Sequence, residues 1–222
     1  MIDNAAASLA PSEVILLHAD EFAPAAGAID AKMDLLHKEG KAQAKGLGRS
    51  LLLAAFLANE QAGVLRLEVR AKKALFGLRT VQALYADPTG QQVQWPDWSL
   101  EARIAQLVQG GSREVSELVY VLLGKDAKSY YNLTPDLAQQ GLAARGLLVA
   151  ETTTHAKIIK TTRLRMPEST GHLAAAQPVE PLRHLLASAE TGRPDLWKKL
   201  VDAVDSGVKR RAEQDTSSSF ND

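Results

Sequence analysis

The apolar run SLLLAAFLANEQAG at residues 50–63 predicts a helix in the centre of the molecule. Its residues are good helix formers, and they are apolar on nearly every face, which is typical of a buried helix. Ser50 is placed to cap its start and Gly63 to end it. The next residues, 64–70, alternate apolar and polar positions as a half-buried strand does, and residues 79–90 predict a second strand that ends in a Pro-Thr-Gly turn.

Helical spacing recurs in the rest of the chain. Ser12 is a candidate N-cap for a short buried helix or strand, and an amphipathic piece between residues 29 and 40 predicts a helix inside a mobile connection. Further apolar stripes predict helices over residues 100–109, 112–123, 134–145, 178–190 and 193–211. Residues 149–166, after the helix that ends at Gly146, predict a hairpin.

This order of elements predicts a mainly α protein with small β-sheets or hairpins. We expect a single helical domain over residues 12–211, a flexible N-terminus at 1–11 and a disordered, Ser-rich tail at 212–222. The helix followed directly by a hairpin resembles the arrangement in winged-helix proteins.

Composition limits the functions that the chain can have. Lys and Arg total 26, as do Asp and Glu, so the overall charge cannot provide the affinity of a typical nucleic-acid binder. Cysteine is absent, which excludes thiol catalysis and disulfides. No run approaches the roughly 18 apolar residues that span a bilayer. We therefore expect a cytoplasmic protein, with any membrane contact made from the surface.

Catalytic and metal-binding patterns are not found in the sequence. No two of the five histidines have the spacing of a helical metal site, and no Ser-His-Asp order is flanked by an elbow sequence. We expect neither an enzyme nor a cofactor. The segment KGLGRS at residues 45–50 places Arg49 at a helix start, where one phosphate could bind free backbone N–H groups; the simpler interpretation is a loop and cap.

Two further segments are candidate contact surfaces. Trp95 and Trp98 lie in a Pro-containing loop, where they either anchor a partner or lipid interface or close the end of the core. The second arm of the 149–166 hairpin is both basic and apolar, which suits anionic lipid headgroups; a solvated hairpin packed on the core is an equally good interpretation. Its candidate residues are Lys157, Ile158, Ile159, Lys160, Arg163 and Arg165.

A winged-helix DNA-binding protein is the alternative. The helix before the wing would then lie in the major groove and present basic or amide side chains. Residues 134–146 offer Gln139, Gln140 and a single cation, Arg145, while Asp136 would oppose phosphate. We therefore rank nucleic-acid binding second.

Several segments in the same order resemble the Golgi phosphoprotein 3 family. They are SLLLAAFLANEQAGVLRLE, DPTG, VSELVYVLLGKD, LAQQGLAARGLLVAE and a later RMP, and together they span about residues 47–168. The resemblance implies a mostly helical domain and a peripheral membrane role through phosphatidylinositol 4-phosphate. It also implies adaptor contacts to membrane enzymes and self-association through the 149–166 hairpin.

The lipid pocket that the resemblance implies is only partly matched in this sequence. The family uses a Trp before the central helix, an Arg near the start of that helix and two Arg at the start of the helix before the hairpin. This chain has no Trp between residues 23 and 46, and it reads NLTPD where the paired arginines are expected. Arg49 alone falls near a matching position.

Overall fold

A computed structural model describes residues 8–74, 79–124, 132–155 and 159–218. The protein is mainly α, as predicted: it is 54% helical and carries small antiparallel sheets of two or three strands. The helices are α1 (Pro11–Leu17), α2 (Ala19–Phe22), α3 (Ala44–Gln61), α4 (Leu100–Gln109), α5 (Val115–Leu122), α6 (Leu133–Ala144), α7 (Glu168–Ala175), α8 (Glu180–Gly192) and α9 (Pro194–Ser218). The strands are β1 (Lys32–Asp34), β2 (Lys41–Gln43), β3 (Leu65–Ala74), β4 (Arg79–Pro88), β5 (Arg113–Glu114), β6 (Val149–His155) and β7 (Ile159–Arg165).

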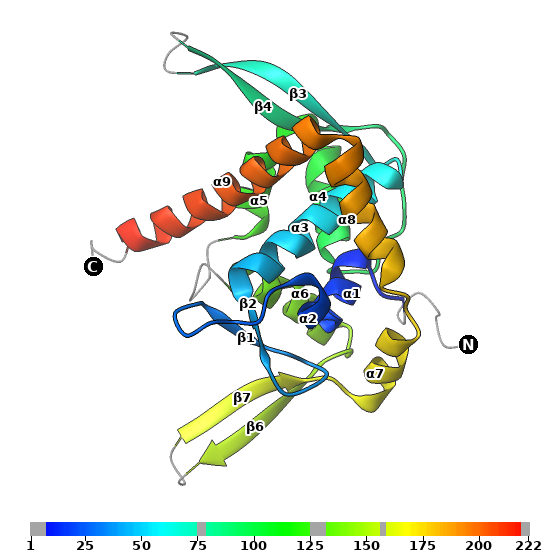
Figure 1. The fold of residues 1–222 in the computed structure, drawn as a ribbon, viewed down its shortest axis with the longest axis vertical. Coiled ribbons are helices and arrows are strands. Elements are labelled where there is room, and N and C mark those ends of the chain that lie inside the picture. The colour runs from blue at the N-terminus through cyan, green and yellow to red at the C-terminus, as the bar shows by residue number, and fades with distance from the viewer. Residues whose placement is uncertain (1–7, 75–78, 125–131, 156–158, 219–222) are drawn as a thin grey trace.

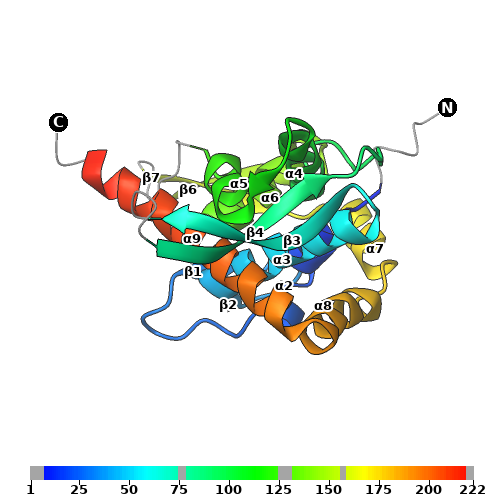
Figure 2. The ribbon, with the colours of Figure 1, turned by 90° about the horizontal axis from the view of Figure 1, so that it is seen from above.

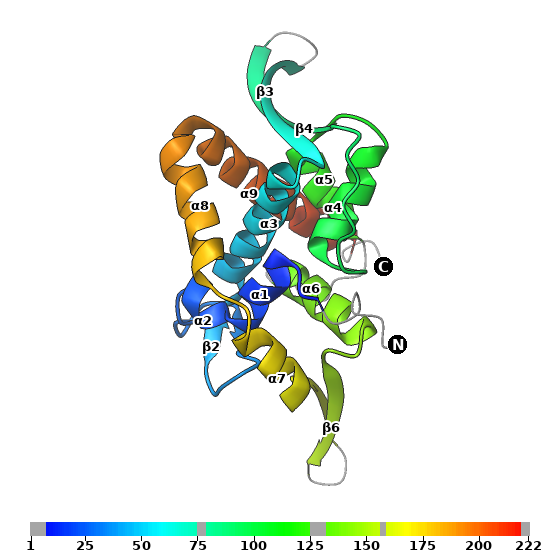
Figure 3. The same ribbon diagram turned by 90° about the vertical axis from the view of Figure 1, so that its right-hand side faces the viewer.

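Helix α3 forms the centre of the core, as its apolar sequence predicts. It packs against α1, α4, α6, α8 and α9 (Figure 3). Leu51, Leu52 and Phe56 are completely buried among these neighbours. Gly63 takes a φ of 72° immediately after the helix, a conformation that favours glycine, and the chain then enters β3.

Two hairpins project from this core toward its two ends (Figure 1). Strands β3 and β4 pair in register from Leu65 with Pro88 to Ala74 with Arg79, and β5 joins at the base of the pair. Strands β6 and β7 form the second hairpin, which follows α6 as predicted. The outer ends of both hairpins and the C-terminal end of α9 lie on one side of the molecule (Figures 1 and 2).

The segment before α3 differs from the prediction. In place of a helix it holds the short strands β1 and β2, which pair from Lys32 with Gln43 to Asp34 with Lys41. The apolar residues that suggested a helix do not share a buried face, since Met33 is buried and Ile29 is 99% exposed. Gly40 has a φ of 137°, which turns the chain between the strands.

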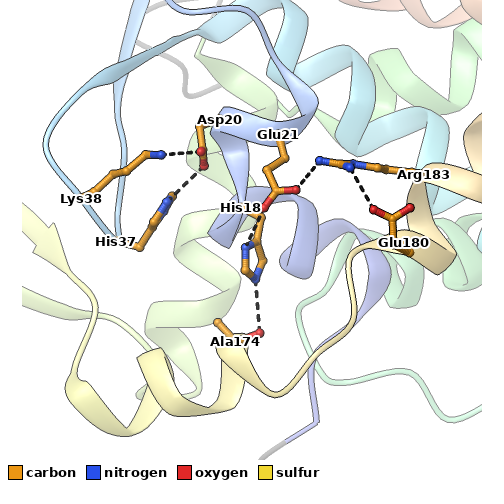
Figure 4. A network of polar contacts seen from close by, with 8 residues as sticks. All are labelled: His18, Asp20, Glu21, His37, Lys38, Ala174, Glu180 and Arg183. Carbon is orange, nitrogen blue, oxygen red and sulfur yellow. Dashed lines mark hydrogen bonds and ion pairs between the residues drawn. The ribbon is translucent and has the colours of Figure 1, made fainter.

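Polar contacts hold this segment to α2 (Figure 4). Asp20 accepts a hydrogen bond from Lys38 at 2.5 Å, and its second oxygen lies 3.1 Å from Nε2 of His37. The neighbouring Glu21 pairs with Arg183 of α8. The β1–β2 segment and α8 are therefore both anchored on the two acidic residues of α2.

The predicted helix caps and chain ends also need correction. Ser12 does not cap α1, because the helix begins at Pro11 and the side chain of Ser12 is buried against α4. Residues 8–10 are not a free terminus, since Ala10 is buried. At the other end, α9 continues to Ser218, into the stretch expected to be disordered, and Ala212 packs against the molecule.

Two corrections concern the middle of the chain. Helix α3 begins six residues before Ser50, and the hydroxyl of Ser50 donates to the carbonyl of Phe22 at 3.0 Å instead of capping the helix. Helix α7 was not predicted; its sequence is rich in Ala and small polar residues and has no clear apolar stripe.

Candidate functional site

A cavity of about 530 Å³ lies where the first turns of α3 and α6 meet the C-terminal half of α9. We refer to it as the α3–α6–α9 cavity. Its walls are formed by Lys45, Gly48, Arg49, Thr134, Val204, Asp205, Val208, Lys209, Ala212 and Glu213.

Close approach of α3 and α6 places both helix starts at the cavity. A Cβ on Gly48 would lie 3.3 Å from both the Cβ of Thr134 and the Cδ of Pro135, so even an alanine would require these neighbours to shift by a few tenths of an ångström. Thr134 is buried at this junction. Glycine at position 48 therefore permits the geometry that brings α6 to the site of Arg49.

Arg49 is held in a two-point ion pair at the cavity wall. Its Nε donates to Oδ1 of Asp205 at 2.9 Å, and its Nη2 donates to Oδ2 of the same carboxylate. The two side chains remain 37% and 39% exposed, so solvent or a ligand can reach both. Asp205 orients the guanidinium, and it also competes with any anion that would bind there.

The remaining charges give the cavity a slight positive excess. The Nζ of Lys209 lies 3.7 Å from Oε1 of Glu213, one helical turn away on α9. Lys45 is exposed, and in the described part of the chain no hydrogen bond or ion pair engages its ammonium group. Three cations and two carboxylates thus line the walls.

The start of α3 adds a field of the same sign. Gln43 occupies the N-cap position but makes no side-chain hydrogen bond to the helix, and the first turn contains no acidic residue. The backbone N–H groups of Gln43 and Ala44 already donate to the carbonyls of Pro24 and Ala31, so the dipole of the helix is the main contribution of this end. The first N–H groups of a helix and its dipole favour an anion at that end. The cavity therefore combines cations with the dipole of a helix start that no side chain caps, a combination that suits a phosphate group.

Only Arg49 among the predicted site residues lines this cavity. Lys45 and Lys209 were missed, although Lys45 lies one turn before Arg49, and Lys209 one turn after Asp205. The spacing of four residues could have indicated a shared helix face. The pairing of α3 with α9, across more than 150 residues of sequence, has no local signature.

Among the described residues, none from the β6–β7 hairpin lines the cavity. Lys157 and Ile158 lie outside the described residues, and only backbone is described at Ile159 and Lys160. Arg163 and Arg165 are exposed. On the neighbouring strand, Oε2 of Glu151 lies 3.7 Å from Nη1 of Arg165. This carboxylate offsets part of the positive charge on which the lipid interpretation of the hairpin depends.

The two tryptophans have different environments. Trp95 is half-buried and donates from Nε1 to Oδ1 of Asn59 at 2.9 Å, which fits its interpretation as a plug at the end of the core. Trp98 is 56% exposed, with the guanidinium of Arg103 5.5 Å from its ring centre. It alone keeps the surface exposure that a partner contact requires.

Arg145, the single cation of the helix before the wing, is unavailable to DNA. Its side chain is 7% exposed, pairs with the buried Glu13 and donates to the carbonyl of Ser8 at 2.9 Å. This arrangement counts against major-groove recognition by α6, which would need the cation on its outer face.

Within the described residues, no helix is long and apolar enough to cross a membrane. The same part of the chain holds no group of three or more His, Asp or Glu side chains that could bind a metal ion. Comparison with protein-family models, with curated proteins and with solved structures finds no match to this chain.

Proposed function

We propose that this protein is a non-enzymatic, peripheral membrane-binding protein whose α3–α6–α9 cavity binds the phosphate of an anionic lipid headgroup. The observation that carries the proposal is the cavity itself: three cations, two carboxylates and a helix start without a side-chain cap line about 530 Å³ of space. A phosphate would gain charge-assisted hydrogen bonds from Arg49 and the nearby lysines.

The resemblance to the Golgi phosphoprotein 3 family supports the same site and implies a specific lipid, phosphatidylinositol 4-phosphate. That resemblance implies a pocket formed by the start of the central helix and the start of the helix before the hairpin. In this chain the two helix starts touch at Gly48 and Thr134. Lys45 and Lys209 would then provide charge in place of the family's paired arginines.

The test is co-sedimentation with phosphatidylcholine vesicles that contain phosphatidylinositol 4-phosphate, for wild type and Arg49→Ala. A charge-assisted hydrogen bond contributes about 1.5–3 kcal/mol, so the variant should bind about 10- to 100-fold more weakly. Arg193→Ala is the matched control, because Arg193 forms an equivalent two-point pair with Glu60, away from the cavity. Equal binding by wild type and Arg49→Ala would refute the proposal.

A further inference from the structure

Strand β3 has one paired side and one open side. Among the described strands its sheet has the order β3-β4-β5, so β4 is the only strand that pairs with β3. The hairpin projects from the helical core (Figures 1 and 3). An edge strand of this kind presents unpaired N–H and C=O groups on which a further strand can assemble. We refer to residues 69–73 as the β3 edge.

Two hydrogen bonds at the base of the hairpin show which backbone groups of β3 face outward. The carbonyl of Val64 accepts from the N–H of Thr89, at the continuation of the β3–β4 pair, so Val64 faces β4. The N–H of Leu67 instead donates to Oε1 of Glu60 at 3.2 Å, outside the sheet. Backbone groups alternate in direction along a strand, so the odd-numbered residues of β3 face away from β4.

Three outward-facing residues of the β3 edge have no backbone partner. They are Val69, Ala71 and Lys73, and in the described part of the chain no backbone hydrogen bond outside the β3–β4 pair involves them. Closer to the core, Glu60 accepts from the outward-facing N–H of β3, and a two-point pair with Arg193 fixes its carboxylate there. An intramolecular acceptor thus covers the inner end of the edge and leaves the outer end open.

The side chains of the β3 edge differ between the two faces of the ribbon. Val69 and Ala71 are exposed on one face, Val69 by 38%. Arg70 and Lys72 lie on the other face and are 36% and 46% exposed. Apart from Glu68, the carboxylates that engage these two cations come from β4 and β5, on the paired side of β3. A strand added at the open side would therefore meet apolar side chains on one face and cations on the other.

A second copy of this chain does not suit the β3 edge. Antiparallel pairing joins outward-facing residues to one another, so the symmetric registers within residues 69–73 are centred on residue 70, 71 or 72. These registers place Arg70 opposite Arg70, Arg70 opposite Lys72, or Lys72 opposite Lys72. Like charges directly opposite each other are destabilising. Acidic residues at the facing positions would instead be stabilising.

We infer that the β3 edge binds an extended segment of a partner protein in which apolar and acidic residues alternate, added to β3 as an antiparallel strand. The apolar residues of the partner lie opposite Val69 and Ala71 and exchange backbone hydrogen bonds with them. Its acidic residues lie opposite Arg70 and Lys72. The antiparallel direction matches the existing sheet, since purely antiparallel sheets are favoured over mixed ones.

The test uses a labelled, end-capped peptide in which glutamate and valine alternate over about seven residues, titrated with the full-length protein and followed by fluorescence anisotropy. The peptide should bind in saturable fashion. The same peptide with lysine in place of glutamate should not bind measurably, because its charges would face Arg70 and Lys72.

Methylation of the peptide backbone tests the register. In the proposed ladder the N–H groups of the valines point toward β3, and those of the glutamates point away. N-methylation of the valines should abolish binding, whereas N-methylation of the glutamates should leave it within about twofold. Both methylated peptides have the same composition, so each is the control for the other.

Two variants of the protein test the edge from its own side. Ala71→Pro removes an outward-facing N–H without removing a bond to β4, and it should weaken peptide binding about 10-fold or more. Arg70→Gln, Lys72→Gln removes both facing cations and should weaken binding up to about 30-fold, while Arg70→Lys, Lys72→Arg should retain it. The control Arg163→Gln, Lys198→Gln removes the same charge at exposed positions on β7 and α9 and should bind as wild type does.

Four results would overturn the inference. They are no binding of the glutamate–valine peptide, equal binding of the lysine peptide, equal effects of the two methylation patterns, and equal loss in the Arg163→Gln, Lys198→Gln control. A dimer in light scattering that Ala71→Pro abolishes would also overturn it, because a second copy would then occupy the edge. Arg49→Ala should bind the peptide as wild type does, which keeps this test independent of the cavity.

Discussion

Glu101 is a buried carboxyl group whose replacement by glutamine should change how stability depends on pH. The side chain is completely buried, and its two oxygens accept hydrogen bonds of 2.7 Å from the backbone N–H and the hydroxyl of Ser12. Burial raises the pKa of Glu101 to about 7, although the bonds from Ser12 favour the ionised form. In the unfolded chain a glutamate loses its proton near pH 4.5.

The sign of the effect follows from proton binding. Between pH 4.5 and about 7 the folded protein keeps a proton that the unfolded chain releases, so the free energy of unfolding falls as the pH rises. At about 1.4 kcal/mol for each pH unit, the loss from this group reaches about 3 kcal/mol and persists above pH 7. Below pH 4.5 both states are protonated, and the group contributes nothing.

Glu101→Gln removes this loss and keeps the local hydrogen bonds. The amide oxygen can accept from the N–H of Ser12, and the amide nitrogen can donate to its hydroxyl oxygen. Urea unfolding at pH 5 and pH 8 should show that the variant gains about 2–3 kcal/mol relative to wild type over this range. The control is Glu180→Gln, because the side chain of Glu180 is 80% exposed; the free energy of unfolding of this variant should change with pH as that of wild type does.

Taking the difference between the variant and wild type cancels the titration of groups common to both. A difference that stays constant from pH 5 to pH 8 would refute the reasoning, because Glu101 would then have the same protonation in the folded and unfolded states. A steep loss of stability in the variant at both pH values would instead show that the amide cannot replace the carboxyl group at Ser12.

Two further pairs of variants test a close helix contact and a buried ion pair. Gly207→Ala should lower the free energy of unfolding by about 1–3 kcal/mol, because its Cβ would lie 2.6 Å from a backbone carbonyl oxygen of α5. The control is Gly192→Ala, whose Cβ would meet nothing within 4 Å and which should not destabilise the protein. Equal effects of the two variants in denaturant melts would contradict this prediction. Arg145→Ala should cost about 3–5 kcal/mol by leaving the buried Glu13 without its partner. Arg66→Ala, at an exposed pair, should cost less than about 1 kcal/mol in the same melts, and a similar loss from both would show that burial does not matter.

The elements that the sequence predicted correctly are those with a strong local pattern. The apolar α3, the alternating β3 and β4, and the helix and hairpin around Gly146 each follow from neighbouring residues. The segment before α3 was predicted wrongly, because Ile29 and Met33 have helical spacing but only Met33 meets the core. Spacing alone does not show which apolar residues a fold will bury.

The candidate site was predictable only at Arg49. Its partner Asp205 and the nearby Lys209 belong to a helix that begins some 150 residues later in the sequence. Their contact depends on how α9 crosses α3, which no local pattern encodes. The same applies to the bonds from Ser12 to Glu101, which join α1 to α4.

The most direct test of the proposed function compares Asp205→Asn with Arg49→Ala in calorimetric titrations with inositol 1,4-bisphosphate. If the cavity binds phosphate, Arg49→Ala should weaken binding. Asp205→Asn should strengthen it several-fold, because it removes a charge that competes for Arg49. If the ion pair only joins α3 to α9, the ligand will not bind, or both variants will bind it as wild type does, and the account of the cavity would be contradicted.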